Sequence, residues 1–164
     1  MKILLLGANG QVGWELQRSL APLGQMKAYD RHALDLGNFE SLRACVRDHR
    51  PEVIVNAAAY TAVEKAESEH DKANRINAEA VAILADEAKQ LNACLIHYST
   101  DYVFDGTKSN AYLETDETNP QSVYAKTKLQ GEEAIKMSEC NHLIFRTSWV
   151  FATRGSNFAK TMIR

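Results

Sequence analysis

The sequence has few of the residues that would build a disulfide framework, a zinc site or a membrane span. It contains three cysteines and three prolines in 164 residues, and Cys45, Cys94 and Cys140 are too widely spaced for a CxxC pair or a metal-ligand motif. No apolar run approaches the roughly 18 residues that a membrane-spanning helix needs. We therefore expect free thiols, buried or half-buried, in a cytoplasmic protein.

The sequence also lacks an excess of charge of either sign. Nineteen Lys and Arg residues face 21 Asp and Glu residues, for a formal net charge of -2. This balance gives no electrostatic footprint for nucleic acid or an anionic membrane. With 45% hydrophobic residues, the chain is long enough for one globular domain with a real core.

Short apolar runs alternate with longer helical patterns along the chain. Strands that are apolar throughout, alternating with helices, indicate a parallel sheet covered by helices on both faces. The pattern predicts strands over Lys2–Leu6, Met26–Tyr29, Val53–Asn56, Cys94–Tyr98 and His142–Arg146, and helices over Gln11–Leu20, Phe39–His49, Asp71–Leu91 and Ser122–Met137.

Three glycines separate the first predicted strand from the first predicted helix, in the spacing GxxGxxG. Gly7 would make a tight turn, Gly10 would let the backbone approach a pyrophosphate, and Gly13 would let the helix pack closely on the strand. The helix N-terminus would then offer free N–H groups to the phosphates. This context predicts an NAD(P)-binding, doubly wound Rossmann-type α/β domain over residues 1–164.

The residues after the second predicted strand leave the choice between NADH and NADPH open. Asp30 could accept hydrogen bonds from the adenosine ribose, or it could be a solvated residue at the end of a strand. Arg31 and His32 follow at once and could instead meet a 2′-phosphate. Asp35 and Leu36 come next and could contact the adenine.

A tyrosine and a lysine four residues apart lie on the last predicted helix. Tyr124 and Lys128 share a face there, and an ammonium beside a phenol would lower the phenol pKa. Such a tyrosine could exchange a proton with a carbonyl oxygen during hydride transfer, and Thr100 or Ser99 could either bond the same oxygen or simply cap a strand. A Tyr-x-x-x-Lys pair alone is more often an ordinary pair on a surface helix, but the dinucleotide-binding pattern around it favours a catalytic role for Tyr124 and Lys128. His97 is more often a packed residue in such a place, and we assign it no chemistry.

On these motifs the whole chain resembles the extended short-chain dehydrogenase/reductases. The resemblance is greatest to the branch that reduces the C4 ketone of dTDP-4-dehydro-6-deoxy-L-mannose with NAD(P)H. It therefore implies an NAD(P)H-dependent reductase with a dTDP-sugar substrate, and it is compatible with a homodimer. The matching segments are GANGQVGWEL, PEVIVNAAAYTAVEKAE, HYSTDYVFDG, VYAKTKLQGE, FRTSWVF and NFAKTM.

The resemblance also implies roles for individual residues. Tyr124 would be the general acid, Lys128 would set its pKa and anchor the ribose, and Thr100 would polarise the ketone. Asp101 and Trp149 match positions that contact the sugar nucleotide. The positions that match cofactor contacts are Gly7, Gly10, Gln11, Val12, Gly13, Asp30, Asp35, Leu36, Ala58, Ala59, Tyr60 and Thr61, together with Tyr124 and Lys128.

Glu15 matches a position that can help hold Mg²⁺ at a subunit contact. A carboxylate in the first turn of a helix is also favoured by the helix dipole, and we prefer that interpretation. Mg²⁺ is therefore a secondary cofactor hypothesis beside NADH or NADPH.

The residue after Asp101 separates reduction from dehydration within the superfamily. Related sugar-nucleotide dehydratases have an Asp-Glu pair directly after the threonine, whereas this sequence has Thr100-Asp101-Tyr102. A tyrosine cannot replace that glutamate, and the epimerases lack the combination of STDYVFDG and RTSWV. Simple reduction is therefore favoured.

Family members continue well beyond 164 residues and add a smaller lobe that completes the substrate pocket. The stretch GSNFAKTMIR begins like a capped helix and stops at Arg164 without a C-cap. We expect a portion of a longer protein that is inactive by itself. The alternatives are a non-catalytic module of the same fold, like the regulatory subunit of methionine adenosyltransferase, or another NAD(P)-dependent sugar-nucleotide epimerase or reductase.

Overall fold

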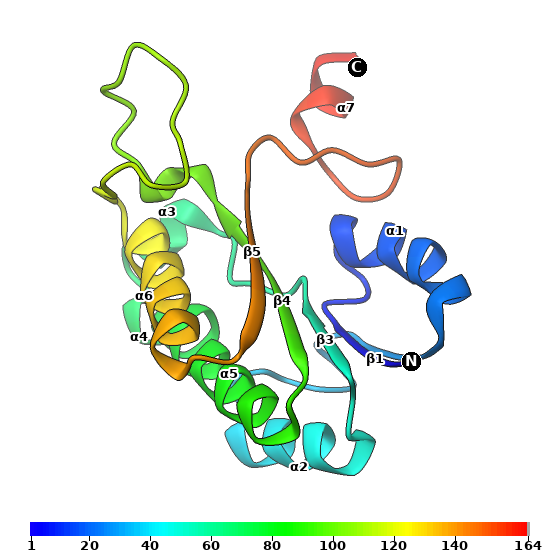
Figure 1. The fold of residues 1–164 in the computed structure, drawn as a ribbon. Helices are drawn as coiled ribbons and strands as arrows, with labels where there is room; N and C mark the ends of the chain where they lie inside the picture. Colours follow the sequence, from blue (N-terminus) through cyan, green and yellow to red (C-terminus); the bar gives the residue numbers. More distant parts are fainter. Residues whose placement is uncertain (164) are drawn as a thin grey trace.

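A computed structural model describes residues 1–163 and contains a five-stranded parallel sheet with the order β2-β1-β3-β4-β5 (Figure 1). The order reverses direction between β1 and β3, because β1 has β2 on one side and β3 on the other. The elements in chain order are β1 (Lys2–Leu6), α1 (Gln11–Leu20), η1 (Ala21–Leu23), β2 (Gln25–Tyr29), α2 (Phe39–His49), β3 (Val53–Asn56), α3 (Val63–Ala66), α4 (His70–Asn74), η2 (Arg75–Glu79), α5 (Ala80–Leu91), β4 (Cys94–Thr100), η3 (Asp101–Val103), α6 (Val123–Ser138), β5 (Asn141–Thr147) and α7 (Phe158–Ile163).

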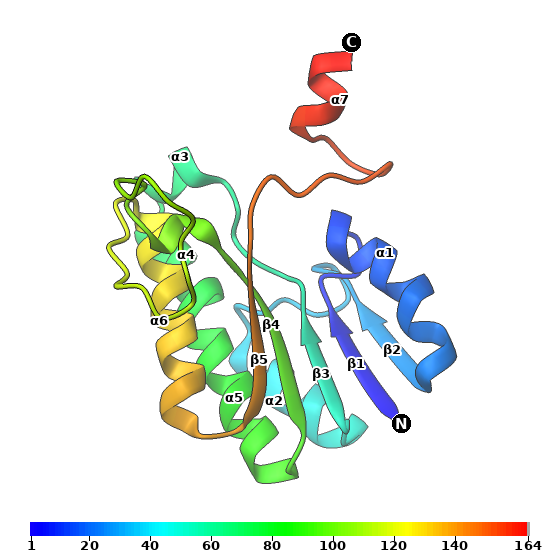
Figure 2. The same ribbon diagram turned by 45° about the horizontal axis from the view of Figure 1, so that its top comes forward.

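Alternate residues of the central strands build two separate cores, one on each face of the sheet. Leu4 and Leu6 of β1 belong to the larger core, which α2 and α5 cover. Ile3 and Leu5 point the other way and pack with Leu16 of α1. Figure 2 shows α1 on one side of the sheet, and α2, α5 and α6 on the other. Helices thus cover both faces of a parallel sheet, which confirms the predicted doubly wound α/β architecture. The central strands are apolar throughout because both of their faces are buried.

The predicted strands and helices are present, with two informative differences. β4 and β5 are longer than predicted, because Ser99 and Thr100 still pair with Arg146 and Thr147 in the ladder. The predicted helix over residues 71–91 is three consecutive segments, α4, the π-helical η2 and α5. A π-helical turn inserts extra backbone without breaking the apolar periodicity, so the sequence pattern alone did not predict it.

The three cysteines are free, with Cys140 buried and Cys45 and Cys94 half-buried, as the sequence predicted. Among residues 1–163, no helix is long and apolar enough to cross a membrane.

Gly13 lies where α1 crosses closest to β1 and the loop that follows it. A Cβ atom at this position would stand 2.1 Å from the carbonyl oxygen of Gly7. We expect Gly13→Ala to lower the free energy of unfolding of the full-length protein by about 1–3 kcal/mol, because α1 must move away from the sheet. Gly10→Ala is the control, since its Cβ would lie 3.3 Å from the same oxygen. Equal losses for the two variants in urea unfolding would contradict this explanation.

Candidate dinucleotide-binding and catalytic site

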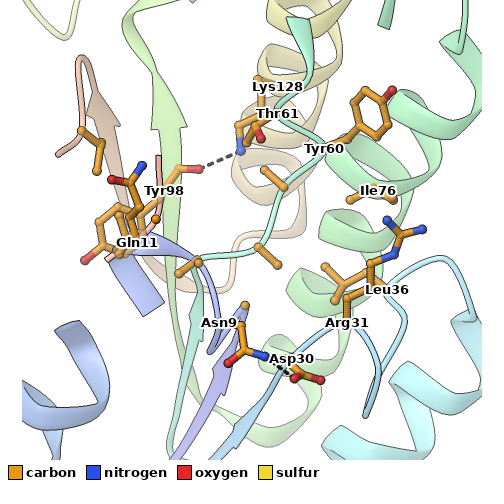
Figure 3. Close-up of a pocket in the computed structure, with 18 of the residues that line it drawn as sticks. Asn9, Gln11, Asp30, Arg31, Leu36, Tyr60, Thr61, Ile76, Tyr98 and Lys128 are labelled. Carbon is orange, nitrogen blue, oxygen red and sulfur yellow. Dashed lines mark hydrogen bonds between the residues drawn. The ribbon is translucent and has the colours of Figure 1, made fainter. Parts of the chain in front are cut away.

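A large cavity lies at the carboxyl ends of β1 and β3, where the strand order reverses. It has a volume of about 560 Å³. Ligands of open parallel sheets bind at such a switch point. Figure 3 shows Gln11, Asp30, Tyr60 and Lys128 among the side chains around it. The predicted cofactor residues that line the cavity are Gly7, Gly10, Gln11, Val12, Asp30, Asp35, Leu36, Ala58, Ala59, Tyr60, Thr61, Tyr124 and Lys128. Gly13 is the exception, because it is buried on the face of α1 that packs against Gly7.

The glycine loop forms a tight turn that lets other backbone come very close. Gly7 has a φ of 84°, and a Cβ there would lie 2.7 Å from the backbone nitrogen of Ala58. The backbone N–H groups of Gly7 and Ala8 both donate to the carbonyl of Tyr29. Gly10 is the N-cap of α1, and no side chain of the described residues caps that end. The end of α1 is thus free to donate N–H groups to a pyrophosphate, as the glycine pattern predicted.

Asp30 uses its carboxylate to shape the loop that it begins. Its Oδ1 accepts hydrogen bonds from the backbone of His32 and Ala33, each 2.9 Å long, and its Oδ2 accepts one from Asn9. The backbone bond from Ala33 is the largest reason why the pKa of Asp30 is lowered. Arg31 also lines the cavity. The carboxylate therefore has structural partners of its own, and the Arg31 side chain extends from it toward Tyr60 (Figure 3).

The segment from Ala57 to Thr61 is fixed by a residue that the sequence did not single out. Asn77, in the π-helical η2, accepts from the Tyr60 backbone nitrogen at 2.8 Å and donates to the Tyr60 carbonyl at 3.1 Å. It also donates to the hydroxyl of Thr127 on α6 at 3.2 Å. Asn77 thus ties the cofactor-side loop to the helix that carries Tyr124 and Lys128.

A second cavity of about 320 Å³ adjoins the first. The predicted substrate residues Thr100, Asp101 and Trp149 line it, and the Trp149 ring packs edge-on against Phe158 at a centroid distance of 4.9 Å. Tyr124 lines both cavities. The phenol therefore lies where a group bound in one cavity would meet a group bound in the other. The roles of these residues stay predictions.

The structure distinguishes the two hydroxyls that the sequence left open. Ser99 also lines the second cavity, but its hydroxyl proton is already donated to the buried carboxylate of Glu132 at 2.5 Å. Thr100 lines that cavity, accepts from the backbone of Tyr102 at 3.2 Å, donates to Asp101 at 3.3 Å, and acts to lower the pKa of Tyr124. Of the two residues, Thr100 is therefore the one whose hydroxyl is placed to act together with the Tyr124 phenol.

The predicted effect of Lys128 on Tyr124 is wrong for this structure. The pKa of Tyr124 is raised, chiefly by burial, and the hydrogen bond with Thr100 only partly opposes this. Lys128 shares the helix face, but its Nζ turns away and lies 2.7 Å from the carbonyl of Tyr98 (Figure 3). Spacing places two side chains on one face but does not fix where a long side chain ends. A phenol with a raised pKa keeps its proton, which suits a proton donor.

The first-turn interpretation of Glu15 is also wrong. Helix α1 begins at Gln11, which puts Glu15 beyond the first turn, and its carboxylate pairs with Arg18 at 2.6 Å. In the part of the chain that the structure describes, no group of three or more His, Cys, Asp or Glu side chains could hold a metal ion. The Mg²⁺ hypothesis thus has no support beyond this one carboxylate.

A glycine-lined dinucleotide groove that meets a Thr-Tyr-Lys cluster on a parallel sheet is the arrangement of a short-chain dehydrogenase/reductase. A family model described as "RmlD substrate binding domain" matches residues 1–164, and the chain belongs to this family. A dTDP-4-dehydrorhamnose reductase of Burkholderia thailandensis is 56% identical over 164 residues, which are all of this chain and 55% of that protein.

Solved structures agree with this family. A dTDP-4-dehydrorhamnose reductase from Clostridium acetobutylicum has a TM-score of 0.95 and 43% identity, covering 99% of this chain and 58% of that one. The reductase of Bacillus anthracis, solved in complex with NADP, has a TM-score of 0.94 and 37% identity over the same shares of the two chains. The chain thus spans little more than half the length of these relatives.

Proposed function

We propose that this chain is the dinucleotide-binding part of an enzyme that reduces dTDP-4-dehydrorhamnose to dTDP-L-rhamnose with NAD(P)H. The family of the chain and the names of its relatives support this substrate. The observation that carries the proposal is the position of Tyr124, which lines both the dinucleotide groove and the second cavity beside Thr100.

In this proposal, bound NAD(P)H supplies a hydride to C4 of the keto sugar. Tyr124 donates its phenolic proton to the ketone oxygen, and Thr100 hydrogen-bonds the same oxygen. Asp101 and Trp149 help to hold the sugar nucleotide in the second cavity. Burial of Tyr124 keeps the phenol protonated before the reaction, because desolvation disfavours the phenolate.

A non-catalytic module that keeps only the cofactor site is the second candidate. Such a module needs the glycine loop and the Ala57–Thr61 segment, but it does not need Thr100 and Tyr124 side by side. The presence of both side chains in the lining of the second cavity therefore favours the enzyme.

The full-length protein should oxidise NADPH only when the dTDP-4-keto sugar is present. The measurement is the loss of nicotinamide absorbance, with chromatographic identification of the dTDP-sugar product. Oxidation at the same rate without the sugar, or tight NADPH binding with no turnover when the sugar is added, would contradict the proposed reaction and favour the regulatory module.

We expect the protein to bind both dinucleotides and to prefer NADPH by about tenfold, or 1.4 kcal/mol. The guanidinium of Arg31 lines the groove and can pair with a 2′-phosphate, while Asp30 is already engaged by its own loop. Parallel calorimetric titrations with NADPH and NADH measure the difference. Arg31→Ala should remove the preference while leaving NADH affinity nearly unchanged, and a preference that survives this change would contradict the assignment.

Residues 1–164 alone should bind a dinucleotide without appreciable turnover, because the relatives extend well beyond this region. A homodimer and a cytoplasmic location stay predictions.

A further inference from the structure

Behind the dinucleotide groove, a line of buried polar groups leads from β3 through β4 to α6. Asn56 and His97 are fully buried, and Lys128 is 1% exposed. Asn56 Nδ2 lies 3.2 Å from His97 Nδ1, and His97 Nε2 lies 3.1 Å from Lys128 Nζ. Of these three residues, Lys128 reaches the groove.

The first link fixes which end of the Asn56 amide faces the histidine. The backbone nitrogen of Ala58 donates to Asn56 Oδ1 at 3.2 Å. A backbone N–H can only donate, so the atom facing it must be the amide oxygen. Asn56 Nδ2, which can also only donate, therefore faces His97 Nδ1.

The second link fixes the proton of the histidine. Because His97 Nδ1 must accept from Asn56, it carries no hydrogen, and the neutral ring has its proton on Nε2. Burial holds the pKa of His97 well below its usual value, so the ring stays neutral.

The third link fixes the state of the lysine. His97 Nε2–H must donate to Lys128 Nζ, and only an amine with a free lone pair can accept this bond. An ammonium has three donors and no acceptor. The neutral amine still donates one N–H to the Tyr98 carbonyl at 2.7 Å. The observed arrangement therefore fits a neutral Lys128.

The surroundings of Lys128 favour the neutral amine more than water does, and the ammonium predominates below about pH 8. Burial lowers the pKa of Lys128 to about 8, and the carboxylate of Glu132 acts in the opposite direction. That carboxylate already accepts from Ser99 and from Arg146 of β5. Tyr124 on α6 and Tyr98 on β4 both have raised pKa values and so contribute no negative charge at neutral pH.

We propose that Asn56 and His97 are positioning residues that stabilise the neutral amine of Lys128 against the Tyr98 carbonyl in mildly alkaline solution, and that dinucleotide binding draws a proton from solvent onto this amine. The inference rests on the proposed dinucleotide site. The pyrophosphate brings negative charge into the cavity that Lys128 lines, and ribose hydroxyls offer acceptors that an ammonium prefers. Protonation removes the lone pair that His97 requires, so the headgroup leaves the histidine and becomes available to the cofactor.

The state of Lys128 can be measured without any activity. In full-length protein with ¹³C at the lysine Cε, one signal should titrate near pH 8, far below the other lysines, and Lys128→Arg should remove it. Ring ¹⁵N shifts should show His97 with its proton on Nε2. A Lys128 signal that titrates above pH 10, or a His97 proton on Nδ1, would overturn the inference.

Asn56→Asp tests the direction of the relay. Its carboxylate can only accept, so His97 must turn its proton to Nδ1, and Nε2 then accepts from an ammonium. The pKa of Lys128 should rise by about one unit or more. If the buried aspartate prevents folding, His97→Gln is the substitute test. Its side chain can turn an amide oxygen to Lys128 Nζ, so it should also raise the pKa of Lys128. A merely structural role would lower stability without moving this titration, and an unchanged Lys128 pKa in both variants would refute the relay.

Calorimetric titration with NADPH in two buffers of different ionisation enthalpy tests the coupling. Because the free amine has a pKa of about 8, binding at pH 8 should take up about half a proton. The uptake should vanish near pH 6.5 and in Lys128→Arg, whose guanidinium is always charged. Tight binding at pH 8 with no proton uptake overturns the coupling. Failure to bind NADPH instead overturns the proposed function, and the NMR titration still decides the state of Lys128.

Discussion

Replacing Tyr124 by phenylalanine is expected to lower NADPH oxidation in the presence of the keto sugar by about 10²–10⁴-fold, the usual contribution of a positioned proton donor. The ring remains in place, but the ketone oxygen loses its proton source. NADPH affinity should change little, because the groove that holds most of the dinucleotide lies along β1, β2 and β3. Steady-state rates and calorimetry on the full-length protein measure the two quantities separately.

Tyr102→Phe is the matched control for this change. Tyr102 packs edge-on against Tyr124 at a centroid distance of 6.2 Å, lines the second cavity and is 49% exposed. Losing its hydroxyl should alter the rate by a small factor only. If Tyr124→Phe retains the parent rate, or if the two variants lose activity equally, Tyr124 is not the acid.

Replacing Arg146 by methionine is expected to lower the free energy of unfolding by about 3–5 kcal/mol, because the buried carboxylate of Glu132 loses its hydrogen-bonded cation and keeps only Lys136, 3.8 Å away. Glu132 is 1% exposed and accepts from Arg146 Nη2 at 2.7 Å and from Nε at 3.1 and 3.2 Å. Arg146 also covers the ring of Phe104. The pair therefore joins β5, α6 and the loop after β4. Urea unfolding of the full-length protein measures the loss.

Two controls separate the unpaired charge from lost packing. Combining Glu132→Leu with Arg146→Met should be less harmful than Arg146→Met alone, because no buried charge remains. Arg43→Met should also lower the free energy of unfolding less than Arg146→Met does, since Glu87 keeps two hydrogen bonds from Arg47. A loss below about 1 kcal/mol for Arg146→Met would show that solvent reaches Glu132 easily.

The parts of the site that the sequence predicted are those whose signals are local. Gly7 indicates a turn with positive φ, and Gly13 indicates a close contact between α1 and the Gly7 turn, because a larger residue would not fit at either place. The central strands β1 and β3 are identifiable because both of their faces are buried. Position at a strand end then brings the glycine loop and the Ala57–Thr61 segment to one edge of a parallel sheet.

The parts that escaped prediction depend on contacts between distant residues. His97 looks like an ordinary strand residue until the fold places Asn56 on one side of its ring and Lys128 on the other. The direction of the Lys128 headgroup is likewise decided by a carbonyl on β4, not by the spacing of Tyr124 and Lys128 on α6. A single asparagine in a helical pattern carries no signal that would have identified Asn77.

The bonds of Asn77 have a mechanical consequence. One amide group braces the Tyr60 backbone against Thr127 on α6, so the wall of the groove and the helix that bears Tyr124 form a single rigid frame. Hydride transfer is sensitive to the alignment of donor and acceptor on the scale of an ångström. In the proposed enzyme, this frame would place the nicotinamide side and Tyr124 relative to each other before either reactant binds. Asn77, which lines neither cavity, would then help to align the proposed reaction.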